Sequence, residues 1–318
     1  MLFRSGTVRL EYLTFGTTDK QYISLDDSSF IVSHCHFPTP TAGFEPNHGT
    51  GGVKAGGHGI YYRNFFGAPN GYNDVFDFTG GQRGGPILYF VQNVMIGSGD
   101  DGLDLDGTDA WVEGNIFMHI HQNGAPDSSS AVSGGNTGTD TSEITVVGNI
   151  MFDCDGAATA KQGNFYTMLN NTIVHMTNEG GGDGDSGAVN VRDTTPDFTT
   201  FGKGYYLEGN IISDVTKLVR NDDPTQAPVV FNNNLLPMAW AGAGTNNQVA
   251  EPLFKHVPTI AETQFANWEQ TQVMWDWLSL RAGSPGKGTG PAGKDKGAVV
   301  SLGVYLSGQP TEIGRAHV

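Results

Sequence analysis

The sequence is poor in positive charge, in cysteine and in long apolar runs. Its 318 residues include 17 Lys and Arg against 33 Asp and Glu, which gives a formal net charge of −16 at pH 7. This balance argues against nucleic acid and anionic membranes as partners, and it favours cations. Two cysteines are too few for a disulfide framework or a cysteine-rich metal site. No apolar run approaches the roughly 18 residues of a membrane-spanning helix, so we expect no membrane insertion.

Helical periodicity is also nearly absent, and a strand-like repeat stands in its place. An apolar stretch is followed by Asn and two mostly apolar residues, and these asparagines are Asn64, Asn93, Asn115, Asn149, Asn171, Asn210 and Asn234. The motif keeps its length while its spacing varies from 22 to 39 residues, as in a coil with constant strands and variable loops. The asparagines are predicted to form an internal ladder of stacked amides and to take no part in catalysis.

A second strand-like segment recurs between these motifs, and most of its copies alternate apolar and polar residues. The copies are residues 75–78, 103–106, 132–135, 158–161 and 189–192. Short strands at regular spacing, with 46 glycines in the chain, predict an all-β protein. We predict a single-stranded right-handed parallel β-helix, a solenoid of about eight to ten coils. Cys35 and Cys154 then lie too far apart to form a disulfide, and both are expected to be free.

Three regions are expected along the chain. Parallel β-helix coils fill residues 1–240, further coils and a capping segment fill 241–305, and a tail follows at 306–318. The capping segment contains Trp268, Trp275 and Trp277, which form either a hydrophobic plug or a platform for stacking sugars. The last seven residues, EIGRAHV, read like translated sequencing-adapter DNA, and the chain is expected to be an internal fragment from an environmental sequence.

Stacking the copies of the second strand in register places their polar residues in columns on one outer face. One column reads Asp77, Asp104, Ser133, Thr159 and Asn190, and its neighbour reads Thr79, Asp106, Gly135, Lys161 and Arg192. The face is therefore acidic at one end and basic at the other. We expect a groove that holds a polymer across the coils, lined by Ser133, Thr159 and Asn190.

The acidic end has a composition that suits calcium, which takes about six to eight oxygen ligands. The candidate ligands are Asp77, Asp100, Asp101, Asp104 and Asp106, with Asp74 nearby. Without a cation, so many neighbouring carboxylates would have raised pKa values. The alternative is a set of solvated acids in turns.

The basic end suits β-elimination on a uronic acid. Lys161 is the candidate base and Arg192 the candidate clamp for the substrate carboxylate. The alternative is a pair of surface charges that offsets nearby acids. His119 and His121 are predicted to share one face of a strand; two histidines at this spacing can bind a transition metal, but no third ligand is evident, and a structural role is the alternative.

These motifs resemble the pectate-lyase-like right-handed β-helix superfamily over nearly the whole chain. The stretches Asp77–Gly80, Asp100–His119 and Ser284–Ala298 are most similar to β-helix regions of very large modular secreted bacterial proteins. This resemblance implies a secreted or cell-surface location in a bacterium, and a role inside a larger multi-domain chain in which this region is monomeric.

Two enzyme families are similar in part. Asp100, Asp101 and Asp104 resemble the calcium-binding acids of polysaccharide lyase family 9, although serine and valine stand where its base lysine would fall. Lys161 and Arg192 resemble the lysine and arginine of polysaccharide lyase family 6, whose calcium acids find no match in register here. The resemblance implies a carbohydrate-active protein that binds calcium.

The expected partner is therefore a polysaccharide, and the expected activity is a calcium-assisted lyase acting on an acidic polymer such as alginate or pectate. One alternative is a glycoside hydrolase in which Asp77 and Asp104 are the paired carboxylates. The other is a carbohydrate-binding or spacer module without catalysis, because fold alone does not define an activity.

Overall fold

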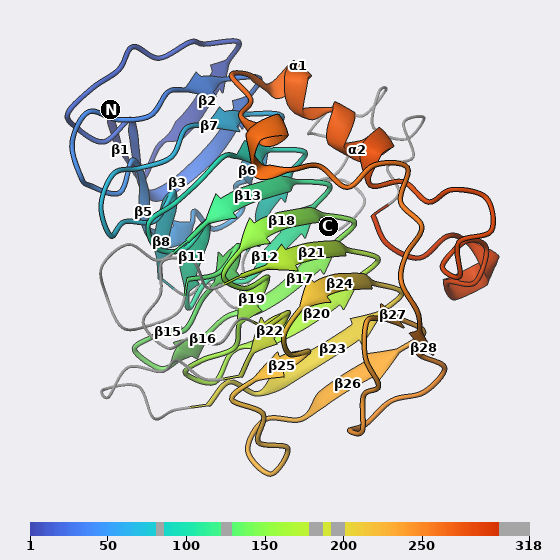
Figure 1. Ribbon diagram of the computed structural model, residues 1–318. Helices are drawn as coiled ribbons and strands as arrows, with labels where there is room; N and C mark the ends of the chain where they lie inside the picture. Colours follow the sequence, from blue (N-terminus) through green and yellow to red (C-terminus); the bar gives the residue numbers. More distant parts are fainter. Residues whose placement is uncertain (81–85, 122–128, 178–186, 192–200, 299–318) are drawn as a thin grey trace.

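The computed structural model describes residues 1–80, 86–121, 129–177, 187–191 and 201–298. These residues are nearly all β-structure, and the strands lie parallel in three rows that follow the chain from its N-terminal to its C-terminal end (Figure 1). None of the described helices is long and apolar enough to cross a membrane. The prediction of an all-β protein with parallel strands is confirmed.

Every row has its strands in chain order. The first row contains β1 (Leu2–Arg4), β3 (Ile23–Ser33), β5 (Asn47–Val53), β8 (Phe76–Thr79), β11 (Leu103–Asp106), β14 (Val132–Ser133), β19 (Ala158–Thr159), β22 (Val189–Asn190) and β25 (Val219–Arg220). The second row contains β2 (Thr7–Glu11), β3 again, β6 (Gly59–Tyr62), β9 (Leu88–Val91), β12 (Ala110–Glu113), β17 (Glu143–Val147), β20 (Phe165–Leu169), β23 (Gly204–Glu208) and β26 (Val229–Asn232). Because β3 runs through both rows, they form one 17-stranded sheet.

The third row is a separate 9-stranded sheet. It contains β4 (His36–Phe37), β7 (Phe65–Phe66), β10 (Val94–Met95), β13 (Ile116–Ile120), β18 (Ile150–Cys154), β21 (Thr172–Met176), β24 (Ile211–Val215), β27 (Leu235–Leu236) and β28 (Gln248–Val249). A short antiparallel pair, β15 (Asn136–Thr137) and β16 (Asp140–Thr141), lies outside the rows.

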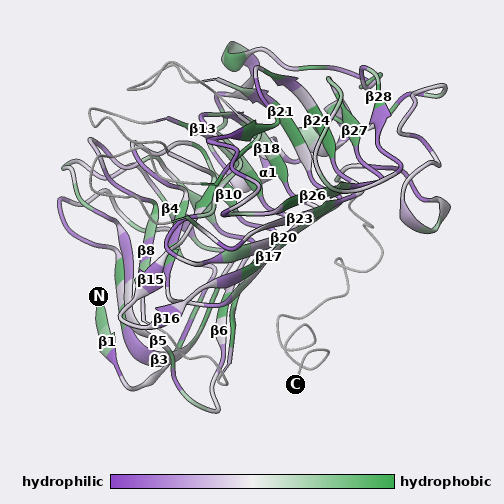
Figure 2. Cartoon of the chain, turned by 90° about the horizontal axis from the view of Figure 1, so that it is seen from below, coloured by the Kyte–Doolittle hydropathy of each residue, from purple (hydrophilic) through white to green (hydrophobic). Residues whose placement is uncertain are grey.

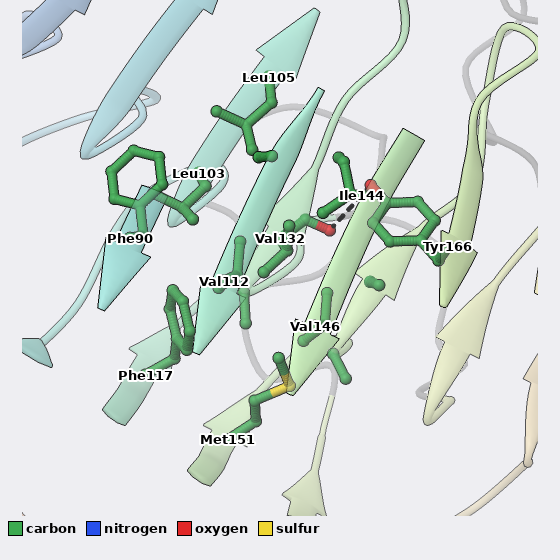
Figure 3. Close-up of a cluster of buried hydrophobic side chains, with 14 of the residues drawn as sticks. Phe90, Leu103, Leu105, Val112, Phe117, Val132, Ile144, Val146, Met151 and Tyr166 are labelled. Carbon is green, nitrogen blue, oxygen red and sulfur yellow. Dashed lines mark hydrogen bonds between the residues drawn. The ribbon is translucent and has the colours of Figure 1, made fainter. Parts of the chain in front are cut away.

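From β5 to β27 the chain visits the first, second and third rows in turn and then returns to the first, and we call each such circuit a pass. Side chains from all three rows meet in one apolar core (Figure 3). In β11, Leu103 and Leu105 point inward and are fully buried, while Asp104 and Asp106, which alternate with them, are partly exposed. Figure 2 shows apolar residues concentrated on the strands and polar residues in many of the connections. The apolar–polar alternation of residues 103–106 therefore places Asp104 and Asp106 on the outer face, as predicted.

The predicted asparagine ladder is confirmed. In every pass from Asn64 to Asn234 the side-chain Nδ2 donates to Oδ1 of the next asparagine at 2.9–3.1 Å, and Asn247 adds a last rung. The residue before each of these asparagines has φ between +51° and +69°, which turns the chain from the second row into the third. Buried amides that satisfy one another in this way stabilise the corner.

Both cysteines are free, as predicted, and both are buried. Cys35 lies at the start of the ladder, where its backbone N–H donates to Asn64 Oδ1 at 2.9 Å. Cys154 ends β18, four passes further along the chain. The separation of the two cysteines explains why no disulfide joins them.

The segment after β28, residues 251–298, folds back along the outer face of the third row, and we call it the cover segment. It contains the short helices η1 (Ile260–Thr263), α1 (Trp268–Thr271), α2 (Val273–Trp277) and η2 (Pro291–Gly293). Its apolar residues, among them Met274 and Leu278, pack on outward side chains of the third row. Trp268 Nε1 donates to the carbonyl oxygen of Gln92 at 2.7 Å. The tryptophans thus cover a side of the stacked passes, with α1 and α2 beside β7 and β13 in Figure 1 and far from β28.

Candidate functional site

The outer face of the first row carries the polar column that the sequence predicts. Parallel pairing places Asp77 opposite Asp104, Asp104 opposite Ser133, and Thr159 opposite Asn190. The column continues at both ends, to His48 opposite Asp77 and to Arg220 opposite Asn190. Neighbouring members are therefore separated by the spacing of adjacent strands, about 4.8 Å.

Only part of this column is open to solvent. Ser133, Thr159 and Asn190, which were expected to line a groove, are 1%, 2% and 4% exposed. Two of these side chains bond within the protein: Thr159 Oγ1 lies 2.6 Å from Ser130 Oγ, and Asn221 Nδ2 donates to Asn190 Oδ1 at 2.8 Å. These three residues present little surface to a polymer, and the accessible part of the column lies over β5, β8 and β11.

Three aspartates converge at the start of β8 and β11. One carboxylate oxygen from each of Asp74, Asp100 and Asp101 lies within 4.8 Å of the other two. Asp74 and Asp101 are only 6% and 4% exposed. The backbone N–H of Asp101 donates to Asp74 Oδ1 at 2.8 Å, and that of Ser130 donates to Asp101 Oδ1 at 2.7 Å. Burial, and then repulsion from neighbouring aspartates, raises the pKa of both Asp74 and Asp101.

A second group, Glu45, His48 and Asp77, also offers three ligand atoms within 4.8 Å of one another. His48 Nε2 lies 3.2 Å from Asp77 Oδ2, and this hydrogen bond is the main cause of a raised pKa for His48. Burial, and then the charge of Asp77, raises the pKa of Glu45. Glu45 and His48 were not predicted from the sequence, because the glycine-rich strand β5 shows no clear alternation of apolar and polar residues. His48 pairs with Asp77 and lies 29 residues before it, a distance close to the spacing of the other strand copies.

In the neighbouring column Asp106 ends β11, and Gly135 and Lys161 each follow two residues after the end of the strand in the next two passes, β14 and β19. Burial, and then the charge of Asp104, raises the pKa of Asp106 to about 7, and the positive charge of Lys161 opposes this rise. A Cβ atom on Gly135 would lie 2.0 Å from Gln162 Oε1 and 2.9 Å from Asp106 Oδ1, so glycine at this position allows the Gln162 amide to pack beside the carboxylate. Lys161 also lowers the pKa of Asp101, so the structure brings the lysine and the acids together.

The other predicted site residue of this column, Arg192, lies outside the described residues. The described face therefore combines closely spaced carboxylates, one lysine and one carboxyl group that titrates near neutral pH. Such a face can hold a hard cation and can move protons. No protein-family model matches the chain, and no curated protein is similar to it in sequence.

Proposed function

We propose that the stacked passes form a single right-handed parallel β-helix of the pectate-lyase-like type. The support is the repeated visit to three parallel rows, with an asparagine ladder at the same corner of consecutive passes. Crossover connections between parallel strands of one sheet are right-handed in nearly all proteins, which favours this hand.

We further propose that the acidic face binds calcium and cleaves an acidic polysaccharide by β-elimination, in a secreted or cell-surface setting. The observation that carries this proposal is the group of Asp74, Asp100 and Asp101, whose oxygens lie within 4.8 Å of one another. Two of these carboxylates are buried and repel each other, and a bound cation relieves that repulsion. An all-oxygen donor set suits calcium. Bound calcium would neutralise the carboxylate of a uronic acid unit and so acidify its neighbouring C–H bond.

Lys161 is the residue that we assign to proton removal. Its neutral amine takes the proton from C5 of the uronic acid, and the electron pair forms the C4–C5 double bond. The C4–O bond breaks, its electron pair stays on the oxygen of the leaving sugar, and that oxygen takes a proton from water. Asp104 and Asp106 lie on the same face, in neighbouring columns. Because a lysine acts as a base only in its neutral form, the rate is expected to rise with pH.

The test measures products from alginate, pectate and chondroitin sulfate in the presence of CaCl2. The expected result is ultraviolet absorbance from the new double bond, lost with a chelator and in Lys161→Ala. Lys294→Ala, which removes an exposed lysine from the cover segment, is the matched control and should retain activity. Unsaturated product that persists in Lys161→Ala would contradict the role of this lysine.

One observation favours a glycoside hydrolase as the second candidate. Asp106, with a pKa of about 7, suits a general acid, and Asp104 lies two residues away on the same side of β11. At ~3.3 Å per residue their Cα atoms are roughly 6.6 Å apart. Side chains that leave the strand in parallel keep about this spacing, which is at the lower end of the roughly 6.5–9.5 Å between the carboxyl groups of inverting hydrolases. The pair expected from the sequence, Asp77 and Asp104, is closer, as in retaining hydrolases.

Products distinguish the two enzymes. New reducing ends without a double bond, lost in Asp106→Asn and kept in Lys161→Ala, would select the hydrolase. Calcium binding with no product from any of these polymers or from neutral glucans and xylans would contradict both enzymes and leave the binding or spacer module.

A further inference from the structure

The cover segment contains a cavity of about 600 Å³ that shares no residue with the acidic face. Its walls come from α2 and from the loops before and after it, beside the third row (Figure 1). The volume lies within the roughly 300–1,000 Å³ of small-molecule sites. The charged residues of the lining are three lysines and two aspartates, namely Lys255, Lys287, Lys296, Asp276 and Asp295. What the cavity can hold depends on how these charges are paired.

Two of the three lysines are paired with the two aspartates. Lys255 Nζ lies 2.5 Å from Asp276 Oδ1, and Lys287 Nζ lies 2.8 Å from Asp295 Oδ2. The other oxygen of Asp295 accepts the backbone N–H of Gly288 at 2.9 Å. Each aspartate therefore already has its own cation, and the charges of these four side chains cancel.

The third lysine, Lys296, is buried and lacks such a partner. It is only 2% exposed, whereas Lys255 and Lys287 are exposed. Its backbone N–H donates to the carbonyl oxygen of Gly286 at 2.9 Å, but its ammonium makes no ion pair or hydrogen bond with any residue that the structure describes. Burial lowers the pKa of Lys296, and no carboxylate among the described residues opposes this shift. A buried, unpaired ammonium costs free energy, and fully buried lysines are almost always paired.

We propose that this cavity binds a sugar that carries a carboxylate, with the ammonium of Lys296 as the partner of that carboxylate. Lys296 lines the cavity, so a ligand bound there can supply the charge that the described residues do not. An ammonium paired with a carboxylate through a charge-assisted hydrogen bond is far less costly to bury than one left alone. The site uses neither the acidic face nor calcium, so it is independent of the proposed lyase activity.

The rest of the lining favours an acidic sugar over other anions. The half-buried side chain of Trp275 offers an apolar wall against which a sugar ring can pack. Gln272 Nε2 and Ser279 Oγ donate to backbone carbonyl oxygens at 3.1 and 2.7 Å, which leaves the side-chain oxygen of each as an acceptor for sugar hydroxyls. Lys296 supplies one positive charge, which matches a carboxylate, whereas a phosphate monoester would bring nearly two negative charges beside the two aspartates.

The experiment measures binding of digalacturonate and dimannuronate to the full chain by calorimetry, in buffer with EDTA so that calcium plays no part. We expect at least one of these disaccharides to bind at one site per chain and to change the tryptophan fluorescence. Its methyl ester has the same rings without the negative charge and should bind at least about tenfold more weakly. Lys296→Met, which keeps an apolar stem of similar length and removes the ammonium, should show the same loss.

Lys294→Met is the matched control, because it removes the charge of a neighbouring, exposed lysine and should leave binding unchanged. Thermal unfolding without ligand checks the fold, and Lys296→Met should be at least as stable as the wild type because it removes an unpaired buried charge. If that variant failed to fold, the comparison of acid and ester on the wild-type chain would still decide. No binding of either acid, equal binding of its ester, equal binding by a folded Lys296→Met variant, or equally tight binding of acetate would overturn the proposal. The lyase is tested separately in CaCl2, so either result can fail alone.

Discussion

Replacing one asparagine inside the ladder should destabilise the protein far more than replacing an exposed asparagine. Asn149 is fully buried. Its Oδ1 accepts from the backbone N–H and from Nδ2 of Asn115 at 2.8 and 2.9 Å. Its Nδ2 donates to the carbonyl oxygen of Val112 and to Asn171 Oδ1 at 2.9 and 3.0 Å. At about 1 kcal/mol for each of these hydrogen bonds, Asn149→Ala should lower the free energy of unfolding by about 4 kcal/mol, a large part of a typical total of about 5–15 kcal/mol.

The assay is urea unfolding followed by circular dichroism, with the free energy of unfolding obtained by linear extrapolation. Asn136→Ala is the matched control, because Asn136 is exposed and its amide donates only to the carbonyl oxygen of Gly138. Asn247→Ala tests the last rung, whose Nδ2 donates to Phe231 and to no further asparagine. A loss below about 1 kcal/mol in Asn149→Ala, or one no larger than that of the control, would refute the ladder as a major source of stability.

Three further predictions concern titration, reactivity and packing. The hydrogen bond to Asp77 holds the pKa of His48 above 6.5, so the stability that this pair contributes is fully present below about pH 6.5 and is lost as the pH rises through the raised pKa. In calcium-free buffer, an NMR titration should show a lower His48 pKa in Asp77→Asn than in the wild type, and an unchanged pKa would disprove the pairing. Cys35 and Cys154 are 2% and 0% exposed, and burial raises the pKa of both thiols. Neither thiol should therefore react with a thiol reagent before the protein unfolds, and rapid reaction of the native protein would contradict their buried positions. Met274 is fully buried between the cover segment and the third row, so Met274→Ala should cost about 2–5 kcal/mol in urea unfolding, and a negligible cost would mean that the cover segment is not firmly packed.

The fold could be predicted where it follows short sequence patterns. Each ladder asparagine sits in a motif of constant length, so the corner of every pass is visible in the sequence. The alternation in β11 fixes which of its residues point inward, and the register of Asp77, Asp104 and Ser133 follows from it. Both patterns are local, and local patterns survive in the folded chain because every pass repeats the same environment.

Other features depend on contacts between distant segments and could not be predicted from these patterns. The sequence of the tryptophan-rich cover segment does not indicate that it packs along the third row, because that position is set by apolar side chains from many passes. The burial of Ser133, Thr159 and Asn190 likewise depends on what lies over the first row and not on strand alternation.

A cluster of histidine and aspartate side chains on the third row is an intermediate case. His119, Asp153 and His175 share one offset from the ladder asparagines, so the sequence contains the signal that brings them together. Although His119 has a positive φ, His119 and His121 both contact Asp153, so the two histidines lie on the same side of the strand as expected. Counting from the ladder, and not only along the strand, brings Asp153 and His175 to the same cluster.

The central claim is that the acidic face of the first row binds calcium, and a calorimetric calcium titration tests it most directly. The wild-type chain should bind calcium. Asp101→Asn should lose this binding because it removes one of the three carboxylate ligands, and it should keep its fold because it also removes the repulsion between buried carboxylates. Asp140→Asn, at an exposed position of β16, should bind like the wild type. No binding by the wild-type chain, or equal binding by Asp101→Asn, would contradict the claim and with it the calcium-assisted lyase.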